Sequence, residues 1–344
     1  MEALIAQAIK DTIVSRKTSV PWNPDEPYLQ SYYTFDDSNS SWVARSPTIE
    51  VSRVSTRSAD ITNIALYTWN IDFMLPFAEA RMKSALAYLG DLTSPQNLSS
   101  TTAPVIFLQE CTPSDLATIA ATLWVRERFH LTDVDSSNWA TTHYGTTMLV
   151  DSRLPITAAF RVHYSKTRMD RDALFVDVSL TNSSSSGSGK KVRLCNTHLE
   201  SMAFDPPFRP PQMQLVAGYM HEKEVHTALA AGDFNAIQPF DRTLHVDNNL
   251  NDAFLELGGK EDTDEGFTWG QQAATKLREQ FGCSRMDKVY FRGDAKLVKF
   301  QRFGEDVLVE GERESREIIE LGFEKPWVTD HLGVMAEVKI VSSS

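Results

Sequence analysis

The sequence has no long hydrophobic run, which limits the classes of protein to which it can belong. None of its apolar stretches approaches the about 20 residues that cross a bilayer as a helix, so we expect no membrane partner. The first apolar stretch contains Glu2, Lys10 and Asp11, which argues against a secretory signal. No Lys/Arg-rich run of the nuclear-import type occurs.

Cysteine is also scarce. The three cysteines, Cys111, Cys195 and Cys283, form no CxxC pair and cannot all be joined in disulfides. A reducing compartment is therefore expected. We predict an intracellular protein of the nucleus and/or cytoplasm, and we expect a monomer.

Positive charge is in deficit. Lys and Arg number 34 against 46 Asp and Glu, which leaves a net charge of −12. This balance argues against indiscriminate binding to polyanions, because such binding uses broad basic surfaces. It does not exclude a phosphate substrate that is held by a divalent metal and a few local cations. The 42% hydrophobic and 23% charged residues are typical of a globular chain rather than a disordered one.

The sequence predicts two parts, an N-terminal segment, residues 1–60, and a single domain, residues 61–344. An amphipathic pattern predicts a helix over residues 1–18. Residues 19–60 are rich in Ser, Pro, Asp and Tyr and are expected to form an irregular arm. Its large aromatic residues, expected to dock on the main body, are Trp22, Tyr32, Tyr33 and Trp42.

From residue 61 onward, strand-like runs alternate with helical patterns. Strands are expected at 64–69, 105–108, 174–180, 192–197 and 332–340. Helices are expected at 76–89, ended by Gly90, from Thr112 onward, and around 211–230, with a flexible hairpin tip at 182–189. Many strands with a few covering helices predict an α/β fold, a four-layered sandwich of two packed, mainly antiparallel sheets flanked by helices.

Polar residues recur where the apolar strands end. The runs ALYTWN, VIFLQE, VRLCNTHLE, ALAAGDFN and PWVTDHLG each carry an acid, an amide or an imidazole at one end, and Asp287 lies inside another strand-like run. Burying such groups costs several kcal/mol each unless they are paired or bind metal. We therefore expect these strand ends to meet at one edge of the sandwich, where a metal ion and an anion would satisfy them.

Each motif alone also has an ordinary structural explanation. Asn70 and Asp233 are compatible with simple turns, and Glu110 with the acid that precedes a helix. His198 is compatible with a satisfied core histidine, and the dipeptide of Asp330 and His331 is a common one. The ordered set with these intervals is what favours a catalytic site.

The ordered motifs TWN, LQE, THLE, GDFN and TDH resemble those of the endonuclease/exonuclease/phosphatase superfamily, which has a DNase-I-like fold. The resemblance covers about residues 61–341. Within the superfamily the stretches TWNID, HLES, TRMDR and FTW are most similar to those of the 5′-tyrosyl-DNA phosphodiesterases.

The resemblance implies a metal-dependent hydrolytic site. Glu110 would be the principal Mg²⁺ ligand, and Mn²⁺ can substitute for Mg²⁺. Asn70 would hold a phosphate oxygen or complete the metal shell, and Asp330 would contact the metal through water. Asp233 would be the general base for the attacking water, which Asn235 would orient.

The same resemblance assigns the two imidazoles. His331 would donate a hydrogen bond to a non-bridging phosphate oxygen, and Asp287 would hold its ring. His198 would donate from the other side of the phosphate. Asp72 would brace Asn70 or the metal shell.

Substrate contacts are expected from residues outside the motif core. Trp269 is a candidate wall for an unpaired DNA end, although a half-buried packing role is an equal alternative. Arg168 and Arg171 lie in a locally basic segment and are candidates for backbone phosphates, with a solvated loop as the alternative. Ser201 is a candidate for holding the phosphotyrosyl end.

Two departures from the animal enzymes concern arginine. Their arginines after the HLES and GDxN-type motifs are replaced here by Met202-Ala203 and Ala236-Ile237. Arg209 is the candidate substitute for the first, and no substitute for the second is evident. The ubiquitin-binding N-terminal domain of the animal members is not recognisable in residues 1–60.

The resemblance implies hydrolysis of the 5′-phosphotyrosyl bond that links a topoisomerase 2 tyrosine to DNA, leaving a 5′-phosphate in DNA repair. The expected partner is a DNA 5′ end that carries a phosphotyrosyl adduct, single-stranded or frayed. The alternative keeps the fold and metal site but acts on a lipid, an inositol phosphate or a nucleotide. An abasic-site endonuclease and a non-catalytic relative are weaker alternatives.

Overall fold

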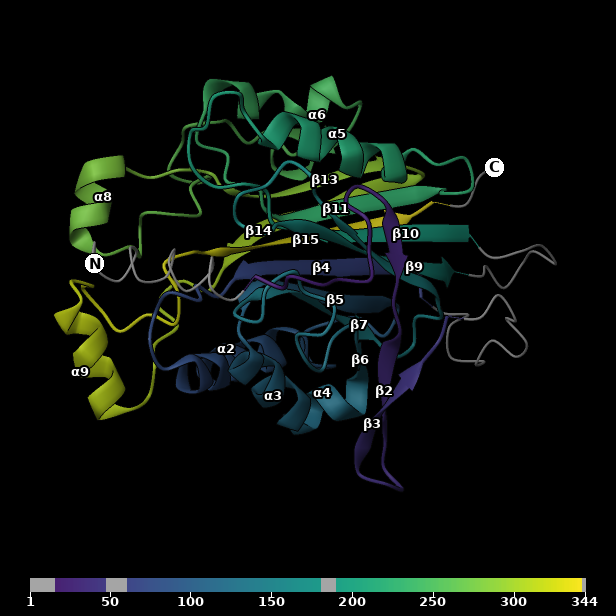
Figure 1. Ribbon diagram of the computed structural model, residues 1–344, viewed down its shortest axis with the longest axis horizontal. Helices are drawn as coiled ribbons and strands as arrows, with labels where there is room; N and C mark the ends of the chain where they lie inside the picture. Colours follow the sequence, from purple (N-terminus) through teal and green to yellow (C-terminus); the bar gives the residue numbers. More distant parts are fainter. Residues whose placement is uncertain (1–15, 48–60, 181–189, 342–344) are drawn as a thin grey trace.

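Two β-sheets packed face to face form the centre of the molecule (Figure 1). The computed structural model describes residues 16–47, 61–180 and 190–341. The seven-stranded sheet has the order β1 (Pro27–Leu29), β8 (Ile156–His163), β9 (Asp172–Leu180), β10 (Lys190–Thr197), β11 (Thr227–Asp233), β13 (Asp287–Gly293) and β12 (Asn251–Asp252). The eight-stranded sheet has the order β14 (Ala295–Phe303), β15 (Gly333–Ile340), β4 (Asn63–Asn70), β5 (Thr102–Cys111), β7 (Gly145–Asp151), β6 (Phe129–Leu131), β2 (Tyr32–Asp36) and β3 (Ser41–Arg45).

Helices cover the two outer faces, which completes four layers. The helices within the described residues are α2 (Ala78–Leu92), α3 (Pro113–Ala121), α4 (Leu123–Arg128), α5 (Arg209–Met220), α6 (Leu244–Asp247), α7 (Ala253–Glu256), α8 (Thr275–Phe281) and α9 (Glu312–Glu320), with a 3₁₀ turn η2 (Pro239–Arg242). In Figure 1, α5 and α6 lie above the seven-stranded sheet and α2, α3 and α4 lie below the eight-stranded one. The predicted α/β sandwich is confirmed.

Alternation along single strands explains why both sheet faces are buried. In β4, Ile64 and Leu66 belong to the core between the sheets. Their neighbours Ala65, Tyr67 and Trp69 belong to the core beneath the helices. Because successive side chains point to opposite faces of a strand, an uninterrupted apolar run fits a strand that is covered on both sides.

The helix predicted at 76–89 continues beyond its expected end. Gly90 lies inside α2, which ends at Leu92. A side chain at position 90 would meet the indole of Trp124, with a Cβ only 2.7 Å from its Nε1. Gly90 is therefore needed for close packing rather than as a stop. By contrast, α3 begins as predicted, with a capping box between Thr112 and Asp115.

The helix predicted around 211–230 is shorter than expected. Helix α5 ends at Met220, and residues 227–233 are the strand β11. This strand pairs with both β10 and β13, so its residues are extended along their whole length. The predicted neighbours β9 and β10 do pair, antiparallel.

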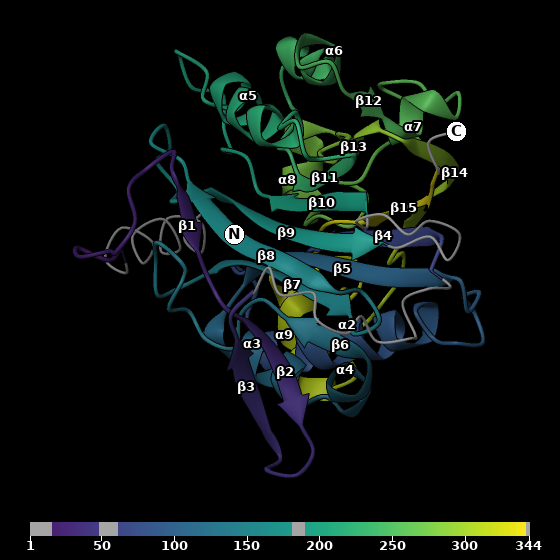
Figure 2. The same cartoon turned by 90° about the vertical axis from the view of Figure 1, so that its right-hand side faces the viewer.

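The N-terminal arm is not irregular. Its strand β1 pairs with β8 at one edge of the seven-stranded sheet, and its hairpin β2–β3 extends the other sheet through β6 (Figure 2). As expected, its aromatic side chains dock on the body: Trp22 stacks on His163, and Trp42 donates a hydrogen bond to the carbonyl of Ala120. Most of the helix predicted at 1–18 and the hairpin tip at 182–189 lie outside the described residues.

Candidate active site

The predicted polar residues gather at one edge of the two sheets because of strand direction. Strands β4 and β5 are parallel, as are β10 and β11, so their carboxyl ends meet at this edge. Asn70 is the last residue of β4 and Asp233 is the last residue of β11. Strand β13 runs antiparallel to β11 and begins at this edge, with Asp287 directly opposite Asp233. The expected juxtaposition is therefore present.

Asp233 lies at the centre of the group. Its Oδ2 accepts a hydrogen bond from Asn70 Nδ2 at 3.0 Å and lies 3.3 Å from His198 Nε2 and 3.8 Å from His331 Nε2. Burial alone raises the pKa of Asp233, but His198 and then His331 outweigh it and hold that pKa well below its usual range. Asp233 is therefore a carboxylate at neutral pH. Its Oδ1 accepts from the backbone N–H of Asn235 at 2.8 Å.

His331 is held by a buried carboxylate. Its Nδ1 lies 2.8 Å from Asp287 Oδ2, and Asp287 is fully buried. Burial lowers the pKa of His331, but the charges of Asp287 and Asp233 outweigh that effect and raise the pKa well above its usual value. The imidazolium form therefore dominates, which leaves an Nε2 donor facing Asp233.

His198 has a different electrostatic environment. Its Nδ1 lies 2.5 Å from Arg171 Nη1. Burial and then the charge of Arg171 lower the pKa of His198. The two imidazoles that flank Asp233 thus differ: His331 is cationic and His198 is neutral.

A group of three carboxylates, those of Asp72, Glu110 and Asp330, lies beside Asn70. Burial, and then the charges of Asp330 and Glu110, raise the pKa of Asp72 well above its usual range. Glu110 Oε2 accepts from the backbone N–H of Phe73 at 3.0 Å. Within the ranges 16–47, 61–180 and 190–341, no three His, Cys, Asp or Glu side chains are close enough to form a ready metal cage.

This donor set nevertheless fits a hard divalent cation. The donors are carboxylate and amide oxygens that repel one another electrostatically, and a cation would relieve that repulsion. Mg²⁺ commonly binds through one or two protein carboxylates, several waters and substrate phosphates, so a cage of three side chains is not required. Glu110, Asp330 and Asn70 would hold such an ion.

Several residues of this edge have unusual backbone conformations. Asp72, Glu110 and Asn235 have φ of 57°, 59° and 47°, in the left-handed region that non-glycine residues seldom adopt. Strain of this kind costs of order 1–3 kcal/mol per residue and persists where surrounding contacts enforce it, often at functional sites.

Arg81 is a residue of the site that the sequence reasoning missed. Its guanidinium is fully buried and donates to the carbonyls of Ile71 at 2.5 Å, Asp72 at 2.8 Å and Val328 at 2.8 Å. It therefore ties the loop that carries Asp72 to the segment that leads to Asp330. The sequence did contain a signal, because Arg81 is a charged residue next to Met82 on the apolar face of the predicted helix.

Gln109 and Asn196 were also missed, although Gln109 lies inside the LQE motif and Asn196 directly precedes the THLE motif. Gln109 Nε2 donates to Asn196 Oδ1 at 2.8 Å, and both side chains are fully buried. They lie on β5 and β10 and so join the two sheets beneath the site.

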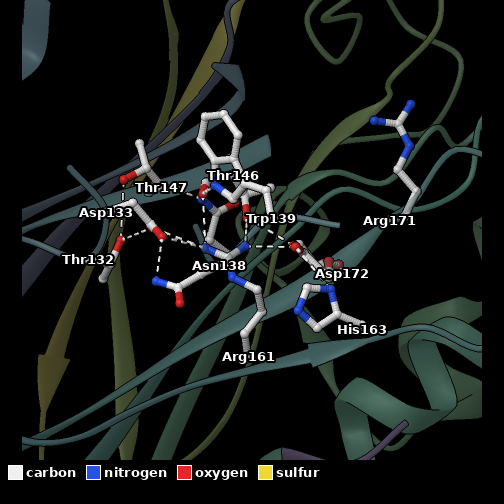
Figure 3. Close-up of polar contacts among 12 residues, drawn as sticks. Thr132, Asp133, Asn138, Trp139, Thr146, Thr147, Arg161, His163, Arg171 and Asp172 are labelled. Carbon is white, nitrogen blue, oxygen red and sulfur yellow. Dashed lines mark hydrogen bonds and ion pairs between the residues drawn. The ribbon is translucent and has the colours of Figure 1, made fainter. Parts of the chain in front are cut away.

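Figure 3 shows a buried ionic network around Arg161. Arg161 lies between two carboxylates, with Nη1 2.7 Å from Asp172 Oδ2 and Nη2 3.0 Å from Asp133 Oδ2. The backbone carbonyl of Asp172 accepts from Thr197 Oγ1 at 3.0 Å. The network is therefore connected to β10, the strand that ends directly before His198.

The predicted substrate-binding arginines occupy different environments. Arg168 is exposed, and its guanidinium lies 4.4 Å from the ring centroid of Phe204 and 5.7 Å from that of Phe208. Arg171 is only 5% exposed and contacts His198, so the solvated-loop alternative does not apply to it, and its contact with a phosphate stays a prediction.

Arg209, the candidate substitute for the missing family arginine, is held in the interior. Its side chain is buried in a pair with Asp241, with Nη2 2.8 Å from Oδ2, and it also donates to the carbonyls of Glu200 and Met202. It supports the loop after His198 from below, because its position at the start of α5 directs it into the body.

Trp269 and Ser201 lie beside the site. The indole Nε1 of Trp269 donates to Asp330 Oδ2 at 2.6 Å, and the ring is half-buried. Ser201 is half-buried in the loop that follows His198. Trp269 therefore borders the carboxylates directly, and its contact with any substrate stays a prediction.

A family model for the endonuclease/exonuclease/phosphatase family matches residues 67–331. The chain belongs to this family. It is thus a member of a phosphoesterase family whose proteins are typically metal-dependent. Residues 67–331 include every catalytic residue predicted above.

Tyrosyl-DNA phosphodiesterase 2 (TDP2) of Gallus gallus is 28% identical over 236 residues, which are 67% of this chain and 57% of that protein. The aligned region is therefore less than two thirds of the length of this relative. The crystal structure of humanized D. rerio TDP2 has a TM-score of 0.60 at 17% identity, covering 80% of this chain and 99% of the other. D. rerio TDP2 complexed with a single strand DNA product has a TM-score of 0.58 at 17% identity, with the same coverage.

These structures confirm the predicted DNase-I-like fold. No helix in the described part of the chain has both the length and the apolar character to cross a membrane.

Proposed function

We propose that this protein is a Mg²⁺-dependent phosphodiesterase that hydrolyses the 5′-phosphotyrosyl bond between a topoisomerase 2 tyrosine and DNA, leaving a 5′-phosphate for DNA repair. The observation that carries the proposal is the position of Asp233. This ionised carboxylate lies between a neutral and a cationic imidazole, at an edge that also bears Glu110 and Asp330. That arrangement suits attack of water on a phosphodiester.

The hydrolytic step assigns one task to each group. A Mg²⁺ ion held by Glu110, with Asn70 and Asp330 beside it, would neutralise the charge that develops on the phosphate oxygens. His331 and His198 donate hydrogen bonds to non-bridging oxygens from opposite sides. Asp233 receives the proton of the attacking water.

The low pKa of Asp233 is compatible with this role. In the free protein the two imidazoles stabilise its charge. When phosphate oxygens accept hydrogen bonds from the two imidazoles, the imidazoles stabilise the charge of Asp233 less. The pKa of Asp233 then rises toward its ordinary value, which makes Asp233 a better base. A tyrosine leaves readily, because a phenol has a pKa near 10 and needs less help from a general acid than an alkoxide does.

Three features support a DNA 5′ end with a phosphotyrosyl adduct as the substrate. TDP2 of Gallus gallus is a relative over 236 residues. Trp269 borders Asp330 and offers a ring on which an unpaired base can stack. Arg168 presents an exposed guanidinium above Phe204, where a strand phosphate can reach it.

Two observations favour a second candidate, a phosphatase or phosphodiesterase for a lipid, inositol phosphate or nucleotide. Met202-Ala203 and Ala236-Ile237 stand where the animal enzymes have arginines, and the net charge is −12. Both features weaken contacts to a long nucleic-acid strand.

A substrate panel separates the candidates. The purified full chain is offered a 5′-phosphotyrosyl oligonucleotide, an abasic duplex, a p-nitrophenyl phosphodiester and inositol phosphates, each with Mg²⁺, Mn²⁺ or EDTA. The proposal expects release of tyrosine that EDTA abolishes. Cleavage confined to the inositol phosphates would overturn it in favour of the second candidate. An Asp233→Asn protein prepared in parallel controls for contaminating phosphatases.

A further inference from the structure

The segment from Thr167 to Arg171 connects a buried glutamate to an imidazole of the site. We propose that Glu200 and Thr167 fix the position of Arg171, and that Arg171 fixes the tautomer of His198 so that its Nε2 carries the proton. All three are positioning residues for His198, and Arg171 Nη2 also lies 3.9 Å from Glu110 Oε1. The inference rests on the proposed function, because it concerns the same reaction.

The contact between Arg171 and His198 determines the direction of the hydrogen bond. Arg171 Nη1 lies 2.5 Å from His198 Nδ1. A guanidinium has only donors and stays charged, so Nδ1 must accept. A neutral imidazole with an accepting Nδ1 carries its proton on Nε2. That proton faces Asp233, whose Oδ2 is 3.3 Å from Nε2.

The guanidinium is confined before any substrate binds. Arg171 is 5% exposed, and its guanidinium carbon lies 5.3 Å from the ring centroid of Tyr144. Tyr144 is fixed in turn, because its hydroxyl donates to the carbonyl of Met169 at 2.5 Å. Arg171 therefore cannot swing toward solvent without disrupting the segment around it.

Thr167 organises that segment through its hydroxyl. Oγ1 donates to Glu200 Oε2 at 2.6 Å and accepts from the backbone N–H groups of Met169 at 3.2 Å and Arg171 at 3.0 Å. These bonds use the one donor and both acceptor positions of a hydroxyl. Thr167 thus folds residues 167–171 into a fixed turn that presents Arg171 inward.

Glu200 explains why the turn stays in place. Although it follows His198 by two residues, its fully buried carboxylate faces Thr167 and the backbone N–H of Arg168, at 3.0 Å from Oε1. Its own N–H donates to Gln212 Oε1 at 2.8 Å, which anchors it to α5. A buried carboxylate is costly unless it is hydrogen-bonded, so these contacts tie residues 167 and 168 to the loop after β10.

The tautomer matters because the phosphate is an anion. With the proton on Nε2, His198 donates to a phosphate oxygen. With the proton on Nδ1, a lone pair would face that oxygen and repel it. A wrong tautomer should lower kcat more than it weakens substrate binding, because the donor acts mainly on charge that develops in the transition state.

The test compares matched pairs of variants in the full chain. Arg171→Met removes the donors and keeps the stem, while Arg171→Lys keeps a cationic donor. Thr167→Val removes the hydroxyl, while Thr167→Ser keeps it. The tautomer of His198 is read by ¹⁵N NMR of histidine-labelled protein, without substrate or metal, and its signals are assigned by their loss in a His198→Gln protein.

We expect the wild type to show a protonated Nε2 and an unprotonated Nδ1. Arg171→Met should give mixed tautomers and lower kcat about tenfold to hundredfold with KM nearly unchanged. Arg171→Lys should partly restore both the wild-type tautomer of His198 and the wild-type kcat. Thr167→Val should shift the tautomer in the same direction, and Thr167→Ser should match the wild type. If Arg171→Met does not fold, the threonine pair decides the question.

Two results would overturn the inference: a wild-type His198 protonated on Nδ1, or a tautomer that neither Arg171→Met nor Thr167→Val changes. Because NMR needs no turnover, this failure is distinct from that of the proposed function. A protein that releases no tyrosine but whose His198 responds to Arg171→Met refutes the function and leaves the positioning intact.

Discussion

The buried network of Figure 3 allows a prediction about stability. Arg161 is fully buried and joins Asp133 and Asp172, which are 1% and 4% exposed. In Arg161→Met, the two carboxylates lose their shared cation and remain in the interior. Breaking a buried pair from one side costs about 3–5 kcal/mol, because a buried charge is left uncompensated.

The corresponding shift in Tm follows from chain length. At about 2.1 cal/mol/K of unfolding entropy per residue, 344 residues correspond to about 0.7 kcal/mol/K. The predicted loss is therefore about 4–7 °C in Tm. The loss of stability in Arg161→Met should also depend on pH. Burial raises the pKa of Asp133 and Arg161 lowers it, so without Arg161 the pKa rises further. The difference in free energy of unfolding between Arg161→Met and the wild type should be largest at neutral pH. It should shrink as the pH falls, because Asp133 then becomes protonated in the folded state.

Calorimetry and urea unfolding at several pH values measure the effect. Arg153→Met is the matched control. Its partner Asp151 lies 2.6 Å away, but the Arg153 side chain is 30% exposed, so the expected cost is about 1 kcal/mol or less. If Arg161→Met is as stable as Arg153→Met, or if its deficit grows as the pH falls, the reasoning about the buried charges is wrong.

Three further predictions concern the proposed reaction. Asp233→Asn should lower turnover about 10²–10⁴-fold while circular dichroism stays unchanged, and a fully active variant would refute its role as base. Asp287→Ala should lower turnover with little change in metal affinity measured by calorimetry, because Asp287 holds His331 rather than the ion; unchanged turnover would count against that pairing. Arg168→Ala should weaken the binding of oligonucleotide substrates and reduce the salt dependence of that binding by about one charge. Turnover of a p-nitrophenyl phosphodiester, which has no strand, should stay unchanged. An equal loss of activity on the oligonucleotide and on the p-nitrophenyl phosphodiester would contradict a contact between Arg168 and the DNA strand.

Local patterns predicted much of the fold because they depend on neighbours in sequence. The apolar run of β4 and the capping box at Thr112 are of this kind, and both are confirmed. The prediction failed at Gly90 and in the N-terminal arm. A turn signal at Gly90 is overridden by packing against Trp124. Short segments such as β2 become strands through pairing with a distant partner.

The candidate site shows the same division. The polar residues at strand ends were readable from the sequence, since an acid or imidazole after an apolar run needs a partner. The environment of each side chain was not readable, because charge and burial arise from residues far apart in the chain. Arg168 and Arg171 have the same residue type three positions apart, yet one is exposed on Phe204 and the other is buried against His198.

The sequence by itself determined the family and the identity of the polar residues at the strand ends, because these depend on residue type and spacing. Only the tertiary structure decided that Asp233 lies between a neutral and a cationic imidazole, that Arg209 supports a loop and that Glu200 faces Thr167. These depend on how β10, β11 and β13 are placed side by side in one sheet while β15 lies in the sheet packed against it. They also depend on the low-dielectric interior, in which a single neighbouring charge changes the protonation of a side chain.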